Sequence, residues 1–211
     1  MAAEIDDALI AVLERSRRLG FLGPGSVRVQ VDHARGFAAG VPGEPERFLD
    51  LGAGGGLPGL VLLTTVWRAA RAVLLDAGER RCEFLRESVA ELGIGDRVQV
   101  VRGRAEEVGR DPALRGSMDV VVARSFGPPP VTAECGAPFL RVGGRLVVSE
   151  PPADDEAPDA DRWPSDGVRR VGLVEDESWA TPYRFRSFVL AEPCPDTYPR
   201  RVGIPAKRPL F

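Results

Sequence analysis

Apolar residues occur along this chain in two alternating kinds of segment. Short, strongly apolar runs are typical of buried strands. They predict strands at Phe48–Leu51, Ala72–Asp76, Val98–Arg102, Asp119–Arg124 and Arg145–Glu150. Segments with helical spacing lie between them, at Leu57–Arg68, Glu79–Leu92 and Pro130–Leu140. Strands that alternate with helices predict an α/β fold with a mostly parallel sheet covered on both faces.

The two ends of the chain are less regular. Before the first strand, Glu4–Leu19 carries a helical apolar stripe, whereas Val27–Gly43 is ambiguous. After the fifth strand, the acidic and proline-bearing Glu156–Asp166 predicts an exposed loop. Val168–Val174 and Phe185–Ala191 then predict a closing antiparallel pair, which brings the sheet to seven strands.

The segment after the first strand is dense in glycine. It reads Phe48-Leu-Asp-Leu-Gly-Ala-Gly-Gly-Gly-Leu-Pro-Gly59, and its glycines formally match the dinucleotide-binding pattern. Asp50 argues against that ligand, because a carboxylate at the strand end repels a pyrophosphate seated on the helix N-terminus. S-adenosylmethionine carries an ammonium and a sulfonium and no phosphate. Asp50 therefore favours this methyl donor over a nicotinamide cofactor.

Polar residues follow the next strands at the edge where ligands bind open parallel sheets. Asp76 ends the second strand, where a carboxylate can accept both hydroxyls of an adenosine ribose. Gly103–Glu107 follows the third strand and is predicted to edge the adenine; the alternative is an ordinary surface loop. Arg124 ends the fourth strand, next to the expected position of the methyl group, or it forms an ion pair that ties the loop down.

Composition narrows the class of protein. The chain has 211 residues, 44% of them hydrophobic, which suits one globular domain with a sizeable core. Its three cysteines are widely spaced and form no Cys-x-x-Cys pattern, so we expect neither disulfides nor a metal site. No apolar run approaches the roughly 20 residues of a membrane span, and we expect a cytoplasmic protein. The net charge of -3 gives no general nucleic-acid signature.

The last stretch, Tyr198–Phe211, is locally basic. It contains Arg200, Arg201, Lys207 and Arg208 and no acidic side chain. Its prolines oppose regular structure. Two interpretations stand: a solvated tail, or an arm that contacts phosphates or borders the active site.

Several of these segments resemble the RsmG/GidB family, bacterial methyltransferases that modify N7 of a guanine in small-subunit ribosomal RNA. Asp50–Gly59, with its Leu-Pro-Gly, is similar to the donor loop of that family, and Leu74–Arg86 to its second strand and helix. Gly103–Glu106 resembles its adenine loop, and Tyr198–Pro209 its basic tail. The resemblance implies a class I, Rossmann-like, S-adenosylmethionine-dependent methyltransferase. Its domain would cover residues 46–195, between a helical cap over 1–45 and the tail over 196–211.

The resemblance also implies roles for single residues. Arg124 is expected to act as the catalytic residue that positions the target base, and to border the donor as well. Acceptor contacts are expected from His33, Arg200, Arg201, Lys207 and Arg208. Donor contacts are expected from Asp50, Gly52, Ala53, Gly54, Gly56, Leu57, Asp76, Ala77, Arg104, Ala105 and Glu106.

Two departures from the family keep other acceptors open. Glu150 stands where the family generally has a lysine, and the amino-terminal portion is short. Both, together with the acidic loop at 153–161, favour a small heteroaromatic nitrogen or oxygen acceptor as the alternative substrate, with His33 or Glu150 as the base that oxygen methylation needs. A non-catalytic, donor-binding interaction module is a third hypothesis. Methylation of guanine N7 needs no base, because that nitrogen has an exposed lone pair, and alignment does most of the work.

Overall fold

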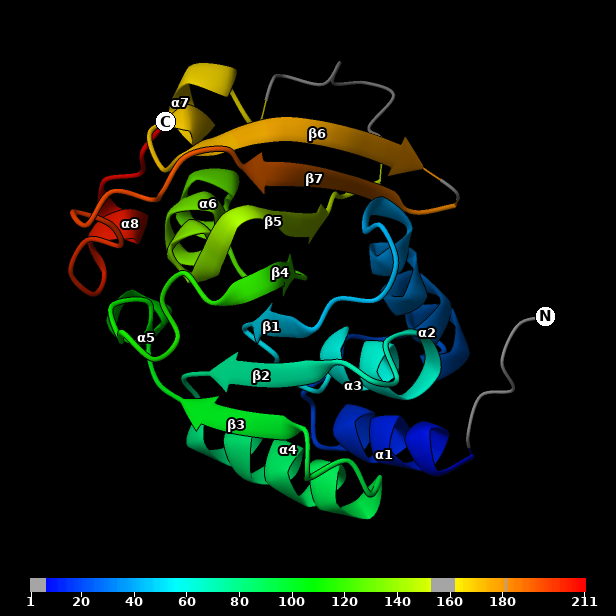
Figure 1. The fold of residues 1–211 in the computed structure, drawn as a ribbon. Coiled ribbons are helices and arrows are strands. Elements are labelled where there is room, and N and C mark those ends of the chain that lie inside the picture. The colour runs from blue at the N-terminus through cyan, green and yellow to red at the C-terminus, as the bar shows by residue number, and fades with distance from the viewer. Residues whose placement is uncertain (1–6, 153–161, 181) are drawn as a thin grey trace.

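The computed structural model describes residues 7–152, 162–180 and 182–211. Within them, seven strands form one sheet in the order β3-β2-β1-β4-β5-β7-β6 (Figure 1). The strands are β1 (Arg47–Leu51), β2 (Arg71–Asp76), β3 (Val98–Arg102), β4 (Met118–Ala123), β5 (Leu140–Ser149), β6 (Leu173–Ala180) and β7 (Arg184–Leu190). Strands β1 to β5 pair in parallel, and β7 runs antiparallel between β5 and β6. This confirms the predicted α/β class and seven-stranded sheet.

Helices cover both faces of the sheet. They are α1 (Asp7–Arg18), α2 (Val27–Arg35), α3 (Gly59–Val61), α4 (Glu79–Glu91), α5 (Ala105–Val108), α6 (Pro129–Gly136), α7 (Ser165–Arg169) and α8 (Ile204–Lys207). Short 3₁₀ turns occur at Gly36–Gly40 and Ala137–Phe139, and a π turn at Leu62–Val66. None of the described helices combines the length and hydropathy needed to cross a bilayer.

The alternation of side chains along β1 explains the two cores. Phe48 packs with residues of α1, α2 and α4 on one face, while Leu49 and Leu51 pack with residues of α6 and α7 on the other. A strand buried on both faces reads as a continuous apolar run, which is why this pattern was visible in the sequence. The amino-terminal helices share the first core with the sheet. The proposed division at residues 45 and 195 stays a prediction.

The connections place a crevice at one edge of the sheet. From the central β1 the chain goes to β2 on one side, and it later returns to β4 on the other side. The connections that leave the carboxyl ends of the neighbouring strands β1 and β4 therefore run in opposite directions. Ligands of open α/β sheets bind at such a switch point.

The predicted closing antiparallel pair is present as β6 and β7, but the predicted bounds Val168–Val174 of its first strand are wrong. Residues 165–169 form α7, and β6 starts only at Leu173. Val168 and Val171 are both buried, and their spacing of three residues suits a helical turn rather than the two-residue period of a strand. Gly172, with a φ of +82°, turns the chain into the strand. In the predicted acidic loop, residues 156–161 lie outside the described residues.

The predicted helix at Leu57–Arg68 is only partly regular. After the single turn of α3 the backbone widens into the π turn, where the Trp67 N–H donates to the Leu62 carbonyl at 2.7 Å. The hydroxyl of Thr65 donates to the Val61 carbonyl at 2.8 Å, a local bond that competes with regular helix geometry. The segment Val27–Gly43, whose sequence pattern was ambiguous, forms α2 and the 3₁₀ turn at Gly36–Gly40.

Candidate active site

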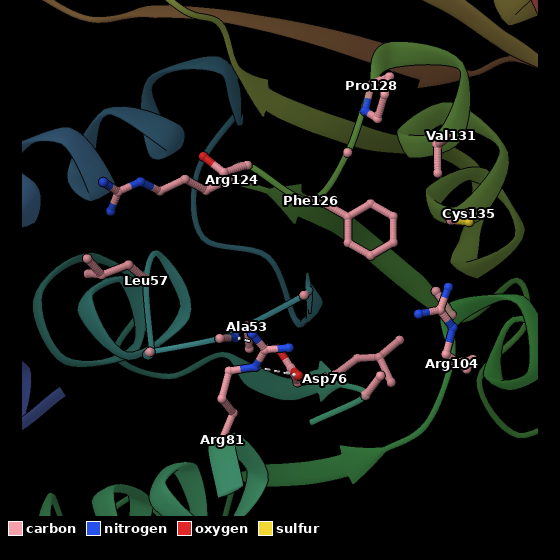
Figure 2. A pocket seen from close by; sticks show the side chains of 18 of the residues that line it. Ala53, Leu57, Asp76, Arg81, Arg104, Arg124, Phe126, Pro128, Val131 and Cys135 are labelled. Carbon is pink, nitrogen blue, oxygen red and sulfur yellow. Dashed lines mark hydrogen bonds and ion pairs between the residues drawn. The ribbon is translucent and has the colours of Figure 1, made fainter. Parts of the chain in front are cut away.

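A cleft of about 710 Å³ opens at the carboxyl ends of the central strands (Figure 2). Its volume lies in the range of roughly 300–1,000 Å³ that is usual for small-molecule sites. The walls come from the glycine loop after β1, the end of β2, the turn after β3 and the loop between β4 and α6. Residues from both ends of the chain complete it, namely Phe21, Leu22, Gly23 and Gln30 before β1, and Ala206 and Pro209 in the tail.

The glycine loop lies close to its neighbours. The N–H groups of Gly52 and Ala53 both donate to the Leu75 carbonyl at 2.9 Å, which fixes the loop against the end of β2. Gly52 has a φ of +76°, and a Cβ there would lie 2.7 Å from Cδ2 of Phe126. A side chain at this position would therefore collide with the loop that follows β4.

Asp50 lies behind the loop rather than in the cleft wall. It is fully buried, and its Oδ2 accepts a hydrogen bond of 2.7 Å from the Gly59 N–H. Its Oδ1 is buried and has no hydrogen-bond partner among the described residues. Burial raises the pKa of Asp50 to about 7, although the bond from Gly59 and the charge of Arg124 act to lower it. An unpartnered buried carboxylate oxygen fits a cationic ligand, whose charge would offset the cost of its burial.

Asp76 lines the cleft at the end of β2. Its Oδ2 accepts from the Gly54 N–H at 2.9 Å, and its Oδ1 accepts from the Gly78 N–H at 2.7 Å and from Nε of Arg81 at 2.9 Å. A carboxylate offers about four lone-pair sites, so these three bonds leave room for a further donor. Arg81, which no sequence motif indicated, pairs with Asp76 inside the cleft.

The turn after β3 lines the cleft on the side away from Arg124. Nη2 of Arg104 donates to Oε1 of Glu106 at 3.1 Å. The same oxygen accepts from the N–H of Gly203 in the tail, also at 3.1 Å. The hydrogen bond from Arg104 and the other local donors hold the pKa of the largely buried Glu106 below its usual value, although burial acts to raise it. Glu106 is therefore an anionic acceptor at the cleft wall.

Arg124 begins the loop after β4. Its Nη2 lies 3.4 Å from Oε1 of Gln30, which comes from α2. Burial lowers the pKa of Arg124, and the carboxylate of Asp50 acts to raise it. Figure 2 shows Arg124 and Arg104 at opposite ends of the cleft, with the ring of Phe126 between them.

Phe126 is a cleft residue that sequence reasoning missed. Its neighbour Ser125 has a φ of +54°, a left-handed conformation that is uncommon in residues other than glycine and tends to mark functional sites. The strained turn directs the aromatic ring into the cleft. The rule that ligands bind at strand ends pointed to this loop, but nothing in the sequence gave the direction of the ring.

Several predicted site residues lie outside the cleft wall. His33 packs against the rings of Phe37, Tyr183 and Phe185. Burial, with a smaller effect from Arg124, lowers the pKa of His33 to about 4. Its imidazole is therefore neutral near pH 7 and sits in an aromatic cluster. Gly56 is also absent from the wall; a Cβ there would meet Leu60.

The tail cations divide into two kinds. Arg200 pairs with the fully buried Glu134 of α6, while Arg201, Lys207 and Arg208 are exposed. The expectation that prolines keep the tail irregular is wrong for α8. Pro205 occupies its first turn, where the missing N–H costs no hydrogen bond.

Glu150 has its own partners. Its carboxylate pairs with Arg162 and accepts a hydrogen bond of 2.7 Å from Nε1 of Trp163. It does not line the cleft. The acid that replaces the family lysine is thus neutralised locally.

The sequence matches the family described as GidB, rRNA small subunit methyltransferase G, over residues 32–163. Curated relatives named ribosomal RNA small subunit methyltransferase G include proteins from three different bacteria. Those from Prochlorococcus marinus (strain MIT 9313) and Deinococcus radiodurans are 36% and 39% identical, over 79% and 77% of this chain and 69% and 65% of their own lengths. The relative from Symbiobacterium thermophilum is 38% identical over 87% of this chain and 78% of its own length.

Solved structures share the architecture at lower identity. An O-methyltransferase from Bacillus cereus in complex with SAH has a TM-score of 0.62 and 16% identity, covering 89% of this chain and 92% of its own. The O-methyltransferase TomG from Streptomyces achromogenes in complex with SAM has a TM-score of 0.62 and 19% identity, covering 90% and 92%. At these identities the likeness establishes the fold alone.

Proposed function

The chain belongs to the rRNA small subunit methyltransferase G family, and from this premise we propose that it transfers a methyl group from S-adenosylmethionine to N7 of a guanine in small-subunit ribosomal RNA. With ribosomal RNA as the substrate, we also propose that the protein acts in the cytoplasm. The observation that carries the proposal is the pair of acids beneath the glycine loop. Asp50 has an unpartnered buried oxygen, and Asp76 keeps a free acceptor site.

These acids favour a cationic nucleoside over a phosphorylated one. A pyrophosphate at the glycine loop would lie close to Asp50 and would be repelled, whereas an ammonium group would be attracted. We assign Asp76 to the ribose hydroxyls, Ala105 and Glu106 to the adenine, and Asp50 to the charge of the donor's amino-acid end. When bound, S-adenosylmethionine supplies an electrophilic methyl group on a sulfonium sulfur.

The other end of the cleft is assigned to the acceptor base. The guanidinium of Arg124 donates a hydrogen bond to Gln30, which fixes its position. From there it orients the guanine edge or a neighbouring phosphate. Phe126 offers an aromatic face on which an unstacked base can rest, as single-stranded RNA bases commonly do on proteins. N7 needs no deprotonation, so these residues act by orientation and by excluding water.

The small-molecule alternative loses part of its support. Glu150, which stands where the family generally has a lysine, is one of the features that favour it, but Arg162 and Trp163 bind that carboxylate away from the cleft. We therefore keep ribosomal RNA as the substrate class. The exposed cations Arg201, Lys207 and Arg208 are assigned to RNA phosphates.

The test has a binding arm and a transfer arm. Calorimetry should detect binding of S-adenosylmethionine and none of NAD. Labelled methyl should pass from the donor to 30S particles, or to their deproteinised RNA, isolated from cells that lack this enzyme, and mapping should find it on guanine N7. Arg124→Ala should slow transfer at least about tenfold, the usual effect of losing a positioned group, with donor affinity changed little. Labelling of a small-molecule extract instead of RNA would overturn the proposal.

A further inference from the structure

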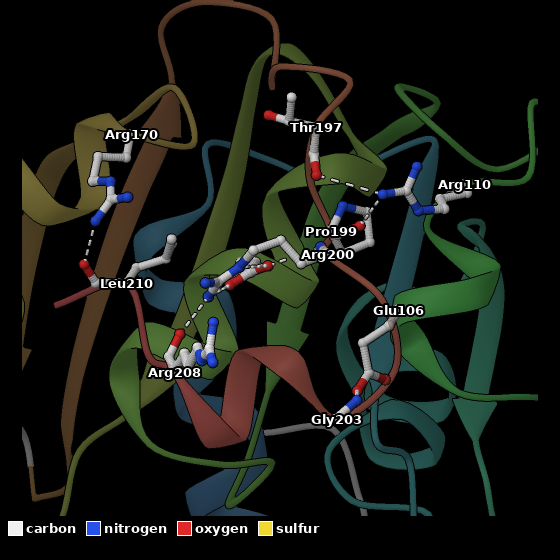
Figure 3. Close-up of polar contacts among 10 residues, drawn as sticks. Glu106, Arg110, Arg170, Thr197, Pro199, Arg200, Gly203, Arg208 and Leu210 are labelled. Atoms are coloured by element: carbon white, nitrogen blue, oxygen red, sulfur yellow. Dashed lines mark hydrogen bonds and ion pairs between the residues drawn. The ribbon is translucent and has the colours of Figure 1, made fainter.

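The carboxyl-terminal segment 198–211 is attached to the domain by many polar contacts (Figure 3). Nη2 of Arg110 donates to the Pro199 carbonyl at 2.5 Å, and Nη1 of Arg115 donates to the Tyr198 carbonyl at 2.8 Å. At the far end, Nη1 of Arg170 donates to the Leu210 carbonyl. The segment is thus held at its start and at its end.

The largest number of these contacts is made by Arg200, directly after Pro199. Glu134 of α6 is fully buried, and its Oε1 accepts from both the backbone N–H and Nε of Arg200 at 2.8 Å. Its Oε2 accepts from Nη2 of Arg200 at 2.5 Å, which completes a bidentate ion pair. Nη2 also donates to the Arg208 carbonyl at 2.7 Å. Arg200 therefore links the start of the tail and the carbonyl of Arg208 to one buried acid. Its guanidinium is occupied by these contacts and is not free for RNA.

The tail held in this way reaches the donor end of the cleft. The N–H of Gly203 donates to Oε1 of Glu106, the carboxylate assigned to the adenine. Ala206 and Pro209 form part of the cleft wall itself. A shift of the tail would remove a donor from Glu106 and open that wall.

We propose that Arg200 and Glu134 are a positioning pair that holds the tail as a wall of the donor cleft and fixes Glu106 through Gly203. The inference rests on the proposed function, because it takes the cleft to be the donor site. Coupling between two binding events is reciprocal. A docked tail strengthens donor binding, and a bound donor strengthens tail docking by the same factor.

The first experiment compares two neighbouring substitutions that remove the same charge. Arg200→Gln breaks the ion pair, while Arg201→Gln removes an exposed cation. By calorimetry with S-adenosylhomocysteine, at a temperature where circular dichroism shows both variants folded, Arg200→Gln should weaken donor binding about 5- to 150-fold, the range of ordinary coupling. Arg201→Gln should leave the donor Kd unchanged, and Glu134→Gln should follow Arg200→Gln. Equal donor Kd values for wild type and Arg200→Gln would overturn the inference and leave the proposed function standing.

The second experiment needs no substitution. Trypsin can cut the tail after Arg201 and after Lys207, and mass spectrometry can follow those cuts separately from cuts elsewhere. Saturating S-adenosylhomocysteine should slow the tail cuts several-fold more than cuts near α1, because local opening of the tail becomes rarer. Tail cuts that do not slow, or that slow no more than all others, would contradict the coupling. A wild-type protein that binds no donor would instead contradict the proposed function.

Discussion

In the proposed function, the carboxyl group of Asp50 gives the site its preference for a cationic ligand. Burial raises its pKa from 3.8 to about 7. An acid whose pKa is raised on folding favours the folded state while it is protonated, so this contribution is complete below about pH 4 and is lost as the pH rises through about 7. The shift corresponds to up to about 4 kcal/mol of folding free energy. Near pH 7 the group is therefore about half ionised, and its anion is destabilised by burial behind the glycine loop.

Donor affinity should therefore depend on pH through Asp50. A cationic donor binds best when Asp50 is ionised, so the donor Kd should fall about tenfold between pH 6 and pH 8. His33 does not interfere, because its pKa of about 4 keeps it neutral over this range. Calorimetry at several pH values measures the effect.

Asp50→Asn is the matched control, because it keeps nearly the same shape and cannot ionise. It should bind the donor weakly, with a Kd that hardly varies between pH 6 and pH 8. Its stability against denaturant should also lose the decline that the wild type shows over this range. A wild-type Kd independent of pH would contradict the role of Asp50.

At the scale of elements, the donor loop depends on close packing of glycine. A Cβ on Gly59 would lie 2.6 Å from both Oδ2 of Asp50 and Cδ2 of Leu74, where the N–H of Gly59 now bonds to Asp50. Gly59→Ala should cost about 1–3 kcal/mol of stability, as overpacking does, and should weaken donor binding. Gly95→Ala is the control, because its Cβ would meet only Cγ1 of Val89 at 3.9 Å. Denaturant unfolding of both variants measures the difference, and equal costs would refute the argument.

The loop between β4 and α6 allows a test of base stacking. Replacing Phe126 by alanine removes the aromatic face, and a stacked base is worth about 1–3 kcal/mol, so kcat/KM for RNA should fall about 5- to 150-fold. The donor Kd should change less than about threefold if the ring contacts the acceptor. Phe126→Tyr keeps the ring and should retain most activity. A large loss of donor affinity in Phe126→Ala would place the ring in the donor site instead.

Elements with a clear pattern of apolar residues could be predicted from the sequence. Elements whose shape depends on side-chain hydrogen bonds to the backbone could not. An inner strand such as β2, predicted at Ala72–Asp76 and found at Arg71–Asp76, was predicted to within one residue because five of its six residues are buried and four of these form a continuous apolar run. The helix after the donor loop breaks into a π turn because threonine hydroxyls take backbone carbonyls, which a count of apolar residues does not register. The error in the bounds Val168–Val174 arose because a short apolar run does not by itself distinguish a buried strand from a buried helical turn.

At the scale of the whole molecule, the cleft depends on contacts between distant parts of the chain. The acids and glycines at strand ends could be predicted, since parallel strands bring their carboxyl ends to one edge. The pairing of Arg200 with Glu134 joins residues 66 positions apart, and the sequence showed Arg200 only as one more basic residue. Its role therefore had to come from the structure.

The distribution of charge predicts how RNA binding responds to salt. The net charge is -3, so attraction to RNA must be local, and the exposed cations Arg201, Lys207 and Arg208 lie on the tail beside the cleft. Each phosphate contact contributes about 0.7 to 0.9 to the slope of log K against log salt. Replacing all three by glutamine should make the slope shallower by about 2 to 3 and weaken RNA binding at low salt. Binding to 30S particles or deproteinised RNA, titrated between about 50 and 200 mM salt, measures it.

The matched control removes three cations at the opposite edge of the sheet. Arg47 and Arg71 begin β1 and β2, and the exposed Arg68 lies just before β2. Changing these three to glutamine alters the net charge equally and should leave the slope close to that of the wild type, because condensed counterions are released only where phosphates are contacted. If both triple variants flatten the slope alike, attraction depends on total charge, and the tail has no special part in holding RNA.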